Sequence, residues 1–397
     1  MKRNRVARGF AALAAMAVIV GACTTGSGAT TAPSAAPATA APTSAPASAP
    51  ASAPASAPAS QAATKFTIGY SNGGGVGNGF REEQVCTAKA QAAASGQVSD
   101  LTVIHRNTDA AGQLADIRSL IAKGVNAIVF NPNDPEALNP ALAEANAQGI
   151  KTVSVDAYVT DPNTYNLYNN QVKYAEIGAR WLFQQLNGTG KVWYTRGIAG
   201  NPADSDRDIG FKNALKDFPG ITVVPGPDGV FTKWDPATAT QLTNDFIASG
   251  QYDQIQGIWA SGMGKQIVDS IKAANKPFVP IADADVGGFV TQLLDTTNFP
   301  GLKGAAVTNT AAVGGAGITL ALKLLNGETV TTSPDATQPN TVLLDPVLLD
   351  NLTPEGQAAL KAWQSVPGMD PLWPLSLSID GWTTYDPNTV PASCKGA

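Results

Sequence analysis

Two aspartates stand directly after short apolar stretches, where buried strands are expected to end. Asp156 follows residues 153–155, and Asp283 follows residues 279–282. A carboxylate at such a point can accept two hydroxyl protons at once and hold a diol through charge-assisted hydrogen bonds. Capping the next helix is the alternative role for each of them. Because the two aspartates occupy equivalent places in two similar halves of the chain, we predict that both bind a polar ligand.

Arg207 and Asn131 are further candidates for contact with a hydroxyl-rich ligand. The guanidinium of Arg207 offers five donors in a fixed fork, or it could pair with one of three aspartates within three positions of it. The amide of Asn131 can both donate and accept, or it could cap the helix that Pro135 is expected to open. We predict ligand contact for both residues.

Aromatic and further polar side chains are expected beside these groups. Trp234 and Phe80 could pack on the apolar C–H face of a sugar ring, with core packing as the alternative. Arg81 follows Phe80 and could reach the ligand or form a solvated surface pair. Asn170 and Asn309 lie on segments expected to cross between the two halves, either as ligand contacts or as hinge turns.

Several kinds of catalysis are excluded by the residues that are missing. His105 is the single histidine, so a zinc site built on several histidines cannot form. Residues 69–73 fit the nucleophile pattern of esterases around Ser71, but that fold needs a histidine late in the chain. The glycines of 73–79 lack the spacing of a dinucleotide-binding loop, and the segment from Asp283 lacks the closing glutamate of a calcium loop. We predict no catalytic residue, no cofactor and no metal; a surface hydrolase is the least favoured alternative.

The elements that position these residues are predicted from short apolar runs that alternate with helical spacing. In the first half, strands are expected at 66–70, 101–105, 127–130 and 152–155, and helices at 80–94, 111–122 and 135–147. In the second half, strands are expected at 192–195, 222–224, 255–259 and 278–281. Such alternation is typical of βαβ units and a parallel sheet. The predicted fold is therefore α/β, with two similar Rossmann-like lobes.

An internal repeat supports this prediction. Segments 169–188 and 308–327 carry Asn, Gly and Leu-Asn-Gly at matching positions, where the chain would cross from one lobe to the other. The expected parts are an N-terminal lobe of 65–169 with about 309–340, a C-terminal lobe of 170–308, and a tail of 341–397 that packs on the lobes. Crossings of this kind bring the carboxyl ends of both sheets to one cleft, where ligands bind in open α/β sheets.

The N-terminus has the pattern of an export signal. Basic residues precede an apolar run at 10–20, which is shorter than the roughly 20 residues of a membrane span. Val20-Gly21-Ala22-Cys23 resembles the bacterial lipobox, which implies a signal peptide of 1–22 and a lipid on Cys23; a plain signal peptide with a chance cysteine is the alternative. Residues 23–64 would form an Ala/Pro/Ser-rich tether, because such a composition cannot bury a core.

The remaining cysteines and the net charge limit the compartment and the partners. Cys86 and Cys394 form an even pair where disulfides are permitted, so we predict a bond between the first helix and the tail; two free thiols are the alternative. The chain has 26 basic and 31 acidic side chains, a formal net charge of −5. Without a basic patch, nucleic acid is not expected as a partner.

Four stretches match the pattern of a known family. They are 130–134 with 155–156, 197–200 with Arg207 and 210–211, Trp234-Asp235, and 281–283. Over about residues 65–330 the chain resembles type I periplasmic sugar-binding proteins of ABC importers, the ribose-binding group. The resemblance implies that Asn131, Asp156, Arg207 and Asp283 bond sugar hydroxyls, and that Trp234 covers a sugar face.

The chain also departs from that family in four ways. The family's glutamine on the last crossover falls at Thr308 or Asn309 here. The family often has an arginine directly after the first aspartate, where this chain has Ala157. An asparagine is usual after the strand that ends at Trp259, where this chain has Ala260-Ser261-Gly262. The tail beyond Pro339 is longer than expected. These changes leave the identity of the sugar open.

The sequence therefore predicts a binding protein and not an enzyme. It would be extracytoplasmic, bound to the cell membrane only through its lipid, and monomeric. It would close two lobes on a sugar and deliver it to an ABC permease in the membrane. A ligand-binding sensor for a nucleoside or signalling diol is the alternative.

Overall fold

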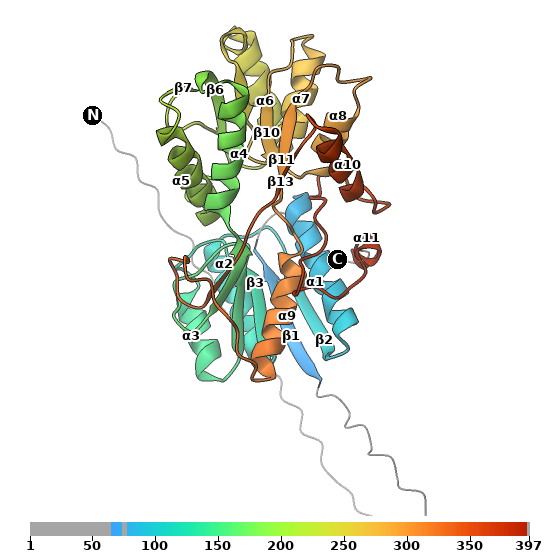
Figure 1. Cartoon of the computed structure of the whole chain (residues 1–397). Helices are drawn as coiled ribbons and strands as arrows, with labels where there is room; N and C mark the ends of the chain where they lie inside the picture. The colour runs from blue at the N-terminus through green and yellow to red at the C-terminus, as the bar shows by residue number, and fades with distance from the viewer. Residues whose placement is uncertain (1–64, 74–77, 395–397) are drawn as a thin grey trace, which may run out of the picture. The chain divides into compact units, whose positions relative to one another are not determined.

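The computed structural model of the chain describes residues 65–73 and 78–394 (Figure 1). The predicted signal peptide, the predicted lipidation at Cys23 and the predicted tether lie outside these residues. In this described part, no helix is both long and apolar enough to cross a membrane.

The N-terminal lobe is built on a 6-stranded sheet with the order β12-β5-β4-β3-β1-β2. Every neighbouring pair in it is parallel. Its strands are β1 (Phe66–Asn72), β2 (Val98–His105), β3 (Ala127–Asn131), β4 (Lys151–Val155), β5 (Tyr165–Asn169) and β12 (Thr341–Leu344). Five of these strands come from the start of the described chain, and β12 comes from near its end.

The C-terminal lobe is built on a 7-stranded sheet with the order β13-β11-β10-β9-β6-β7, and β8 pairs with β6 outside this path. Only β13 runs antiparallel to its neighbour, β11. Its strands are β6 (Thr189–Arg196), β7 (Gly220–Val224), β8 (Val230–Phe231), β9 (Gly257–Trp259), β10 (Ile281–Ala284), β11 (Gly304–Val307) and β13 (Leu348–Asp350). Two lobes with predominantly parallel sheets confirm the predicted fold class.

Helices cover both sheets. They are α1 (Gly79–Ser95), α2 (Ala110–Ala122), α3 (Asn139–Ala147), α4 (Gln171–Gln185), α5 (Pro202–Lys216), α6 (Pro236–Ala248), α7 (Gly264–Ala273), α8 (Gly287–Leu294), α9 (Val313–Leu325), α10 (Pro354–Trp363) and α11 (Val390–Ser393), with short 3₁₀ turns η1 (Tyr252–Gln254) and η2 (Pro387–Thr389). Six of the described helices begin after a side chain that accepts a backbone N–H of the first turn: Asn78 before α1, Asp109 before α2, Asn170 before α4, Asn201 before α5, Asp235 before α6 and Thr353 before α10.

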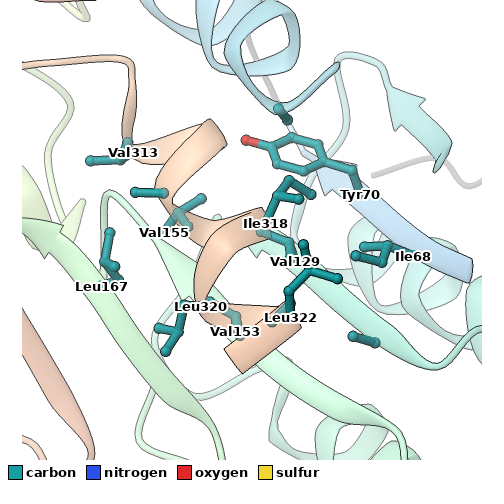
Figure 2. Close-up of a cluster of buried hydrophobic side chains, with 14 of the residues drawn as sticks. Ile68, Tyr70, Val129, Val153, Val155, Leu167, Val313, Ile318, Leu320 and Leu322 are labelled. Carbon is teal, nitrogen blue, oxygen red and sulfur yellow. The ribbon is translucent and has the colours of Figure 1, made fainter. Parts of the chain in front are cut away.

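The core of the N-terminal lobe joins segments that are far apart in the sequence. Helix α9 follows β11 of the other lobe and packs on β3, β4 and β5. Figure 2 shows Val129, Val155 and Ile318 within this apolar cluster. A Cβ at Gly317 would lie 2.5 Å from Cγ1 of Val155, so the helix can approach the sheet this closely only because residue 317 is glycine.

Several predicted element boundaries are wrong, and two of them lie beside candidate site residues. Helix α3 begins at Asn139 and not at Pro135, since Asp134 caps the N–H groups of residues 136 and 137, and the carbonyl of Pro135 accepts from the N–H of Thr160 at 2.9 Å. Strand β10 covers Ile281–Ala284 and not 278–281. Its parallel partners β9 and β11 fix the register, so Asp283 lies inside the strand.

The segment from 341 onwards contributes to both lobes. It supplies β12 to one sheet and β13 to the other. Helix α10 packs on α8 of the C-terminal lobe, and α11 packs on α1 of the N-terminal lobe. A disulfide joins Cys86 in α1 to Cys394, with 4.7 Å between the two Cα atoms.

Candidate functional site

A cavity opens where the carboxyl ends of the two sheets meet. Its space, including the open mouth, is about 830 Å³. Its lining includes six predicted ligand contacts: Phe80, Arg81, Asp156, Arg207, Trp234 and Asn309. Among the lining residues that were not predicted are Asn78, Asn201, Met263, Gln266, Leu372 and Pro374. Asn78 and Asn201 carry a sequence signal, because each precedes a helix as a capping residue; the other four carry none.

Asp156 directly follows β4, and its backbone lies in the left-handed region, at φ 68°. Such a conformation is uncommon for a residue with a side chain, and it often marks a functional position. One carboxylate oxygen accepts from Nδ2 of Asn131 at 3.1 Å. Burial raises the pKa of Asp156, although the positive charges of Arg81 and Arg207 act in the opposite direction. A ligand hydroxyl that donates to this carboxylate would compensate for the water that burial has removed.

Arg81 brings a guanidinium toward Asp156 from the first turn of α1. Its Nη1 donates to Oδ1 of Asn72 at 3.1 Å. Burial lowers the pKa of Arg81, while the negative charge of Asp156 raises it. The position after the first aspartate, where the resembling family often has arginine, is Ala157 here. In this chain, α1 therefore provides a positive charge close to the same carboxylate.

Asn131 lies beneath the cavity and does not line it. Its Nδ2 donates to Asp156 and to Oε1 of Gln84, the latter at 2.8 Å, and its side chain is fully buried. It does not cap a helix at Pro135, so the alternative role is not observed. Three atoms around it have no hydrogen-bond partner among the described residues: Oδ1 of Asn131, Nε2 of Gln84 and the hydroxyl of Tyr70. Buried polar groups are normally paired, so three atoms without a partner in this region are unusual.

Arg207 reaches the cavity from α5 and is 5% exposed. Its Nε donates to Oε1 of Gln171 at 2.8 Å, and its Nη1 donates to the carbonyl of Ser261 at 3.3 Å. Its guanidinium carbon lies 4.3 Å from the ring centroid of Tyr174 and 5.3 Å from a ring centroid of Trp234. Among the described residues it has no ion pair. The neighbouring acids Asp204 and Asp208 pair with Arg196 instead.

Trp234 forms an aromatic wall of the cavity. Its backbone φ is 49°, and its Nε1 donates to the carbonyl of Ser261 at 2.8 Å. A Cβ at Gly197 would lie 2.1 Å from its ring, so the ring packs directly on that backbone. Trp259, in contrast, is a core residue that packs edge-on against Tyr174.

Asp283 is fully buried and does not line the cavity. Its two carboxylate oxygens accept the N–H groups of Gly262 and Gly264, the latter at 2.7 Å. Burial raises the pKa of Asp283 to about 6, although these N–H groups lower it. The structure therefore places this carboxylate as an anchor for the loop that carries Gly262 and Met263 to the cavity.

The two crossover asparagines differ. Asn170 caps α4 by accepting from the N–H of Lys173 at 3.0 Å, donates to Asp345 at 3.3 Å, and lies outside the cavity. Asn309 lines the cavity, and its Oδ1 accepts from Gln171 at 2.9 Å and from Asn169 at 3.2 Å. Gln171 was not predicted, yet it links Arg207 to Asn309 across the crossover.

A two-lobed α/β protein with a polar cavity at the carboxyl ends of both sheets has the architecture of a solute-binding protein. Residues 68–329 match the family described as periplasmic binding protein domain, and the chain belongs to this family.

Named relatives agree with this assignment. The xylitol-binding protein of Mycolicibacterium smegmatis is 26% identical over 231 residues, which are 57% of this chain and 64% of the relative, just under two thirds of its length. The ribose import binding protein RbsB of Haemophilus influenzae is 27% identical over 241 residues, which are 58% of this chain and 76% of the relative.

A solved structure agrees as well. The ABC transporter solute binding protein from Thermobispora bispora superposes with a TM-score of 0.66 at 25% identity, covering 78% of this chain and 90% of that chain. The resemblance to type I periplasmic sugar-binding proteins is confirmed.

Proposed function

We propose that this chain binds a small sugar in the cavity and presents it to an ABC importer in the membrane. The observation that carries the proposal is the cavity lining itself. One carboxylate, two guanidinium groups and several amides face the same space as the rings of Trp234 and Phe80. Charged and amide groups suit sugar hydroxyls, and aromatic rings suit the C–H faces of the sugar. The named relatives, which bind ribose and xylitol, support a ligand of this class.

Binding requires no covalent chemistry. Closure of two lobes around a polyol removes water from the hydrogen bonds to Asp156, Arg81 and Arg207, which strengthens them. Crossover residues such as Asn309 and Gln171 would connect the movement of the lobes to the ligand. The permease would then recognise the closed form.

A thermal-shift screen tests the proposal. The probes would be D-ribose, xylitol, L-arabinose, D-galactose, D-fucose, myo-inositol and, for the sensor alternative, adenosine. A ligand at about 100 times its dissociation constant stabilises the protein by roughly 2.7 kcal/mol. Stabilisation by at least one sugar or polyol, abolished in Arg207→Ala, is expected. Stabilisation by adenosine alone would favour the sensor, and no stabilisation by any probe would reject sugar binding.

We also propose that residues 1–22 are a signal peptide and that Cys23 carries a lipid anchor, with 23–64 as the tether. The short apolar run, the lipobox-like residues and the uncharged stretch that follows support this. In a bacterial host, Cys23→Ala is expected to abolish incorporation of labelled palmitate and to release the protein from membranes. A variant that stays in the membrane fraction without lipid would contradict the anchor.

A further inference from the structure

The C-terminal strap, defined as residues 370–394, is bonded to the C-terminal lobe at its start. The N–H groups of Gly287 and Gly288 donate to the carbonyls of Trp373 and Pro371 at 2.8 and 2.7 Å. These N–H groups open α8 and have no partner within the helix. Asp285 accepts the N–H of Ser376 at 3.1 Å through its side chain, and its carbonyl accepts the N–H of Leu375 at 2.9 Å.

The same strap is bonded to the N-terminal lobe further on. Gln91 of α1 accepts the N–H of Thr384 at 2.8 Å and donates to its hydroxyl at 3.0 Å. The disulfide of Cys86 with Cys394 fixes the end of the strap on the same helix. An apolar cluster between the strap and α1 includes Trp373, Leu377 and Tyr385. The strap is therefore an additional connection between the lobes, beyond the crossovers.

Within the first of these attachments the strap lines the cavity with Leu372 and Pro374. Leu372 is partly exposed there, and Pro374 pairs with Val286. A Cβ at Gly79 would lie 2.6 Å from the ring of Trp373 and 2.7 Å from the carbonyl of Leu372, so the strap lies directly on the first turn of α1. That turn carries Phe80 and Arg81.

The cavity is lined by both apolar and polar side chains. Leu372, Pro374, Val286 and Ala284 are apolar, whereas Asp156, Arg81, Arg207 and Asn309 are polar or charged. The side chains of Leu372 and Pro374 cannot hydrogen-bond, and proline has no N–H. A ligand hydroxyl pressed against these two side chains on closure would lose its water without gaining a partner from them.

We infer that Leu372 and Pro374 are specificity-determining residues, which select ligands that present a C–H edge or a deoxy carbon to the strap. The inference rests on the proposed sugar binding and names the sugar class: deoxy sugars are preferred over their hydroxylated counterparts. Discrimination against a misplaced hydroxyl arises because that group would be buried without a hydrogen-bond partner.

The test compares pairs of sugars that differ by one hydroxyl. Dissociation constants would be measured by calorimetry for D-fucose against D-galactose, L-rhamnose against L-mannose, and 2-deoxy-D-ribose against D-ribose. The wild type is expected to bind the deoxy member of at least one pair tenfold more tightly or better. Leu372→Asn, which offers an amide to the extra hydroxyl, is expected to reduce that ratio at least tenfold.

Controls separate this role from a structural one. Leu352→Asn changes a leucine of the same C-terminal region that is 38% exposed and does not line the cavity, and it should leave the ratio unchanged. If Leu372→Asn does not fold, Leu372→Ala and Pro374→Ser replace it. Equal or weaker binding of the deoxy member in every pair, or an unchanged ratio in the Leu372 variant, overturns the inference while sugar binding stands. If no sugar binds to the wild type, the proposed function itself fails.

Discussion

Asp156 directly follows β4 and Asp283 lies near the end of β10, and their surroundings give the two carboxylates different roles. Asp156 accepts one side-chain N–H from Asn131 and faces the cavity. Asp283 accepts two backbone N–H groups and is closed off from the cavity. The positions of the two aspartates in the sequence could not distinguish these roles. The backbone N–H groups of residues 262 and 264 come within hydrogen-bonding distance of Asp283 only when their loop folds.

Substitution by asparagine should separate these roles. Asp156→Asn is expected to weaken sugar binding roughly 10- to 100-fold, because charge-assisted bonds are lost on closure. Its melting temperature without ligand should change little, since burial already disfavours the charge, as its raised pKa indicates. Calorimetry and thermal unfolding would measure the two effects. Unchanged affinity would remove Asp156 from the site.

Asp283→Asn is expected to cost about 1–3 kcal/mol of unfolding free energy, because an amide NH₂ would meet a backbone N–H. Urea denaturation without ligand measures this cost. The exposed Asp228, for which no side-chain bond is found among the described residues, gives the control Asp228→Asn, expected to be neutral. An Asp283 variant as stable as that control would argue against the anchoring role.

Asp206, beside Arg207 on α5, predicts a pH dependence. Burial raises its pKa from 3.8 to about 6, and it has no hydrogen-bond or ion-pair partner among the described residues. Because the folded form binds its proton more tightly than the unfolded form, the stability from this group is complete below about pH 4 and is lost as the pH rises through about 6. Asp206→Asn should therefore be more stable than wild type at pH 7, with the difference vanishing near pH 4. Urea titrations at both pH values test this, and a pH-independent difference would contradict it.

At the scale of elements, the two crossover helices α4 and α9 each pack closely on a sheet through a glycine. Gly178 of α4 and Gly317 of α9 occupy matching positions of the internal repeat. A Cβ at Gly178 would lie 2.7 Å from the ring of Trp259, and one at Gly317 would lie 2.5 Å from Val155. The repeat visible in the sequence therefore marks the places where each helix approaches its own sheet.

Gly317→Ala tests this contact. Alanine favours the helix by about 1 kcal/mol over glycine, but the added methyl should overpack the contact with Val129 and Val155 and cost about 1–3 kcal/mol. In urea unfolding, the free energy of unfolding of this variant is expected to be equal to that of the wild type or lower. Gly226→Ala, at a glycine with no atom within 4 Å of the added Cβ, should leave stability unchanged. A Gly317 variant stabilised by the full propensity gain would show that the helix can move away from the sheet.

The sequence predicted the strands and helices that show a regular pattern of apolar residues. It did not predict the segments whose positions depend on contacts with residues far away in the sequence. The alternation of apolar runs identified β1, β3 and β4 because a buried parallel strand must be apolar on both faces. The start of α3 was missed because the turn at Asp134 and the contact of Pro135 with Thr160 replace the first helical turn. The sequence predicted that the tail packs on the lobes and that Cys394 bonds to Cys86, but not the path of the strap, since that path depends on bonds to Asp285, Gly287 and Gln91 and not on any repeat.

At the scale of the whole molecule, the disulfide closes a loop of great length, with a sequence separation of 308. Linking distant residues restricts the unfolded chain, which stabilises the fold by roughly 2–5 kcal/mol. The double variant Cys86→Ser with Cys394→Ser should unfold at lower urea, and maleimide should label neither cysteine of the wild type in urea without reductant. Labelling of both cysteines under those conditions would exclude the bond.

The strand order of the N-terminal lobe has a consequence for biosynthesis. A nascent chain that has reached Asn169 contains five of the six strands of this sheet, but α9 and β12, which complete its core and its edge, are made after the whole of β6 to β11. At a translation rate of roughly 5–20 residues per second, the apolar faces of β3 and β4 wait on the order of 10 s for their covering helix. The half that is translated first is thus completed only after most of the other half has been made. Until then its open edge at β5 can pair with other chains, which exposes this lobe to aggregation while the rest of the protein is being made.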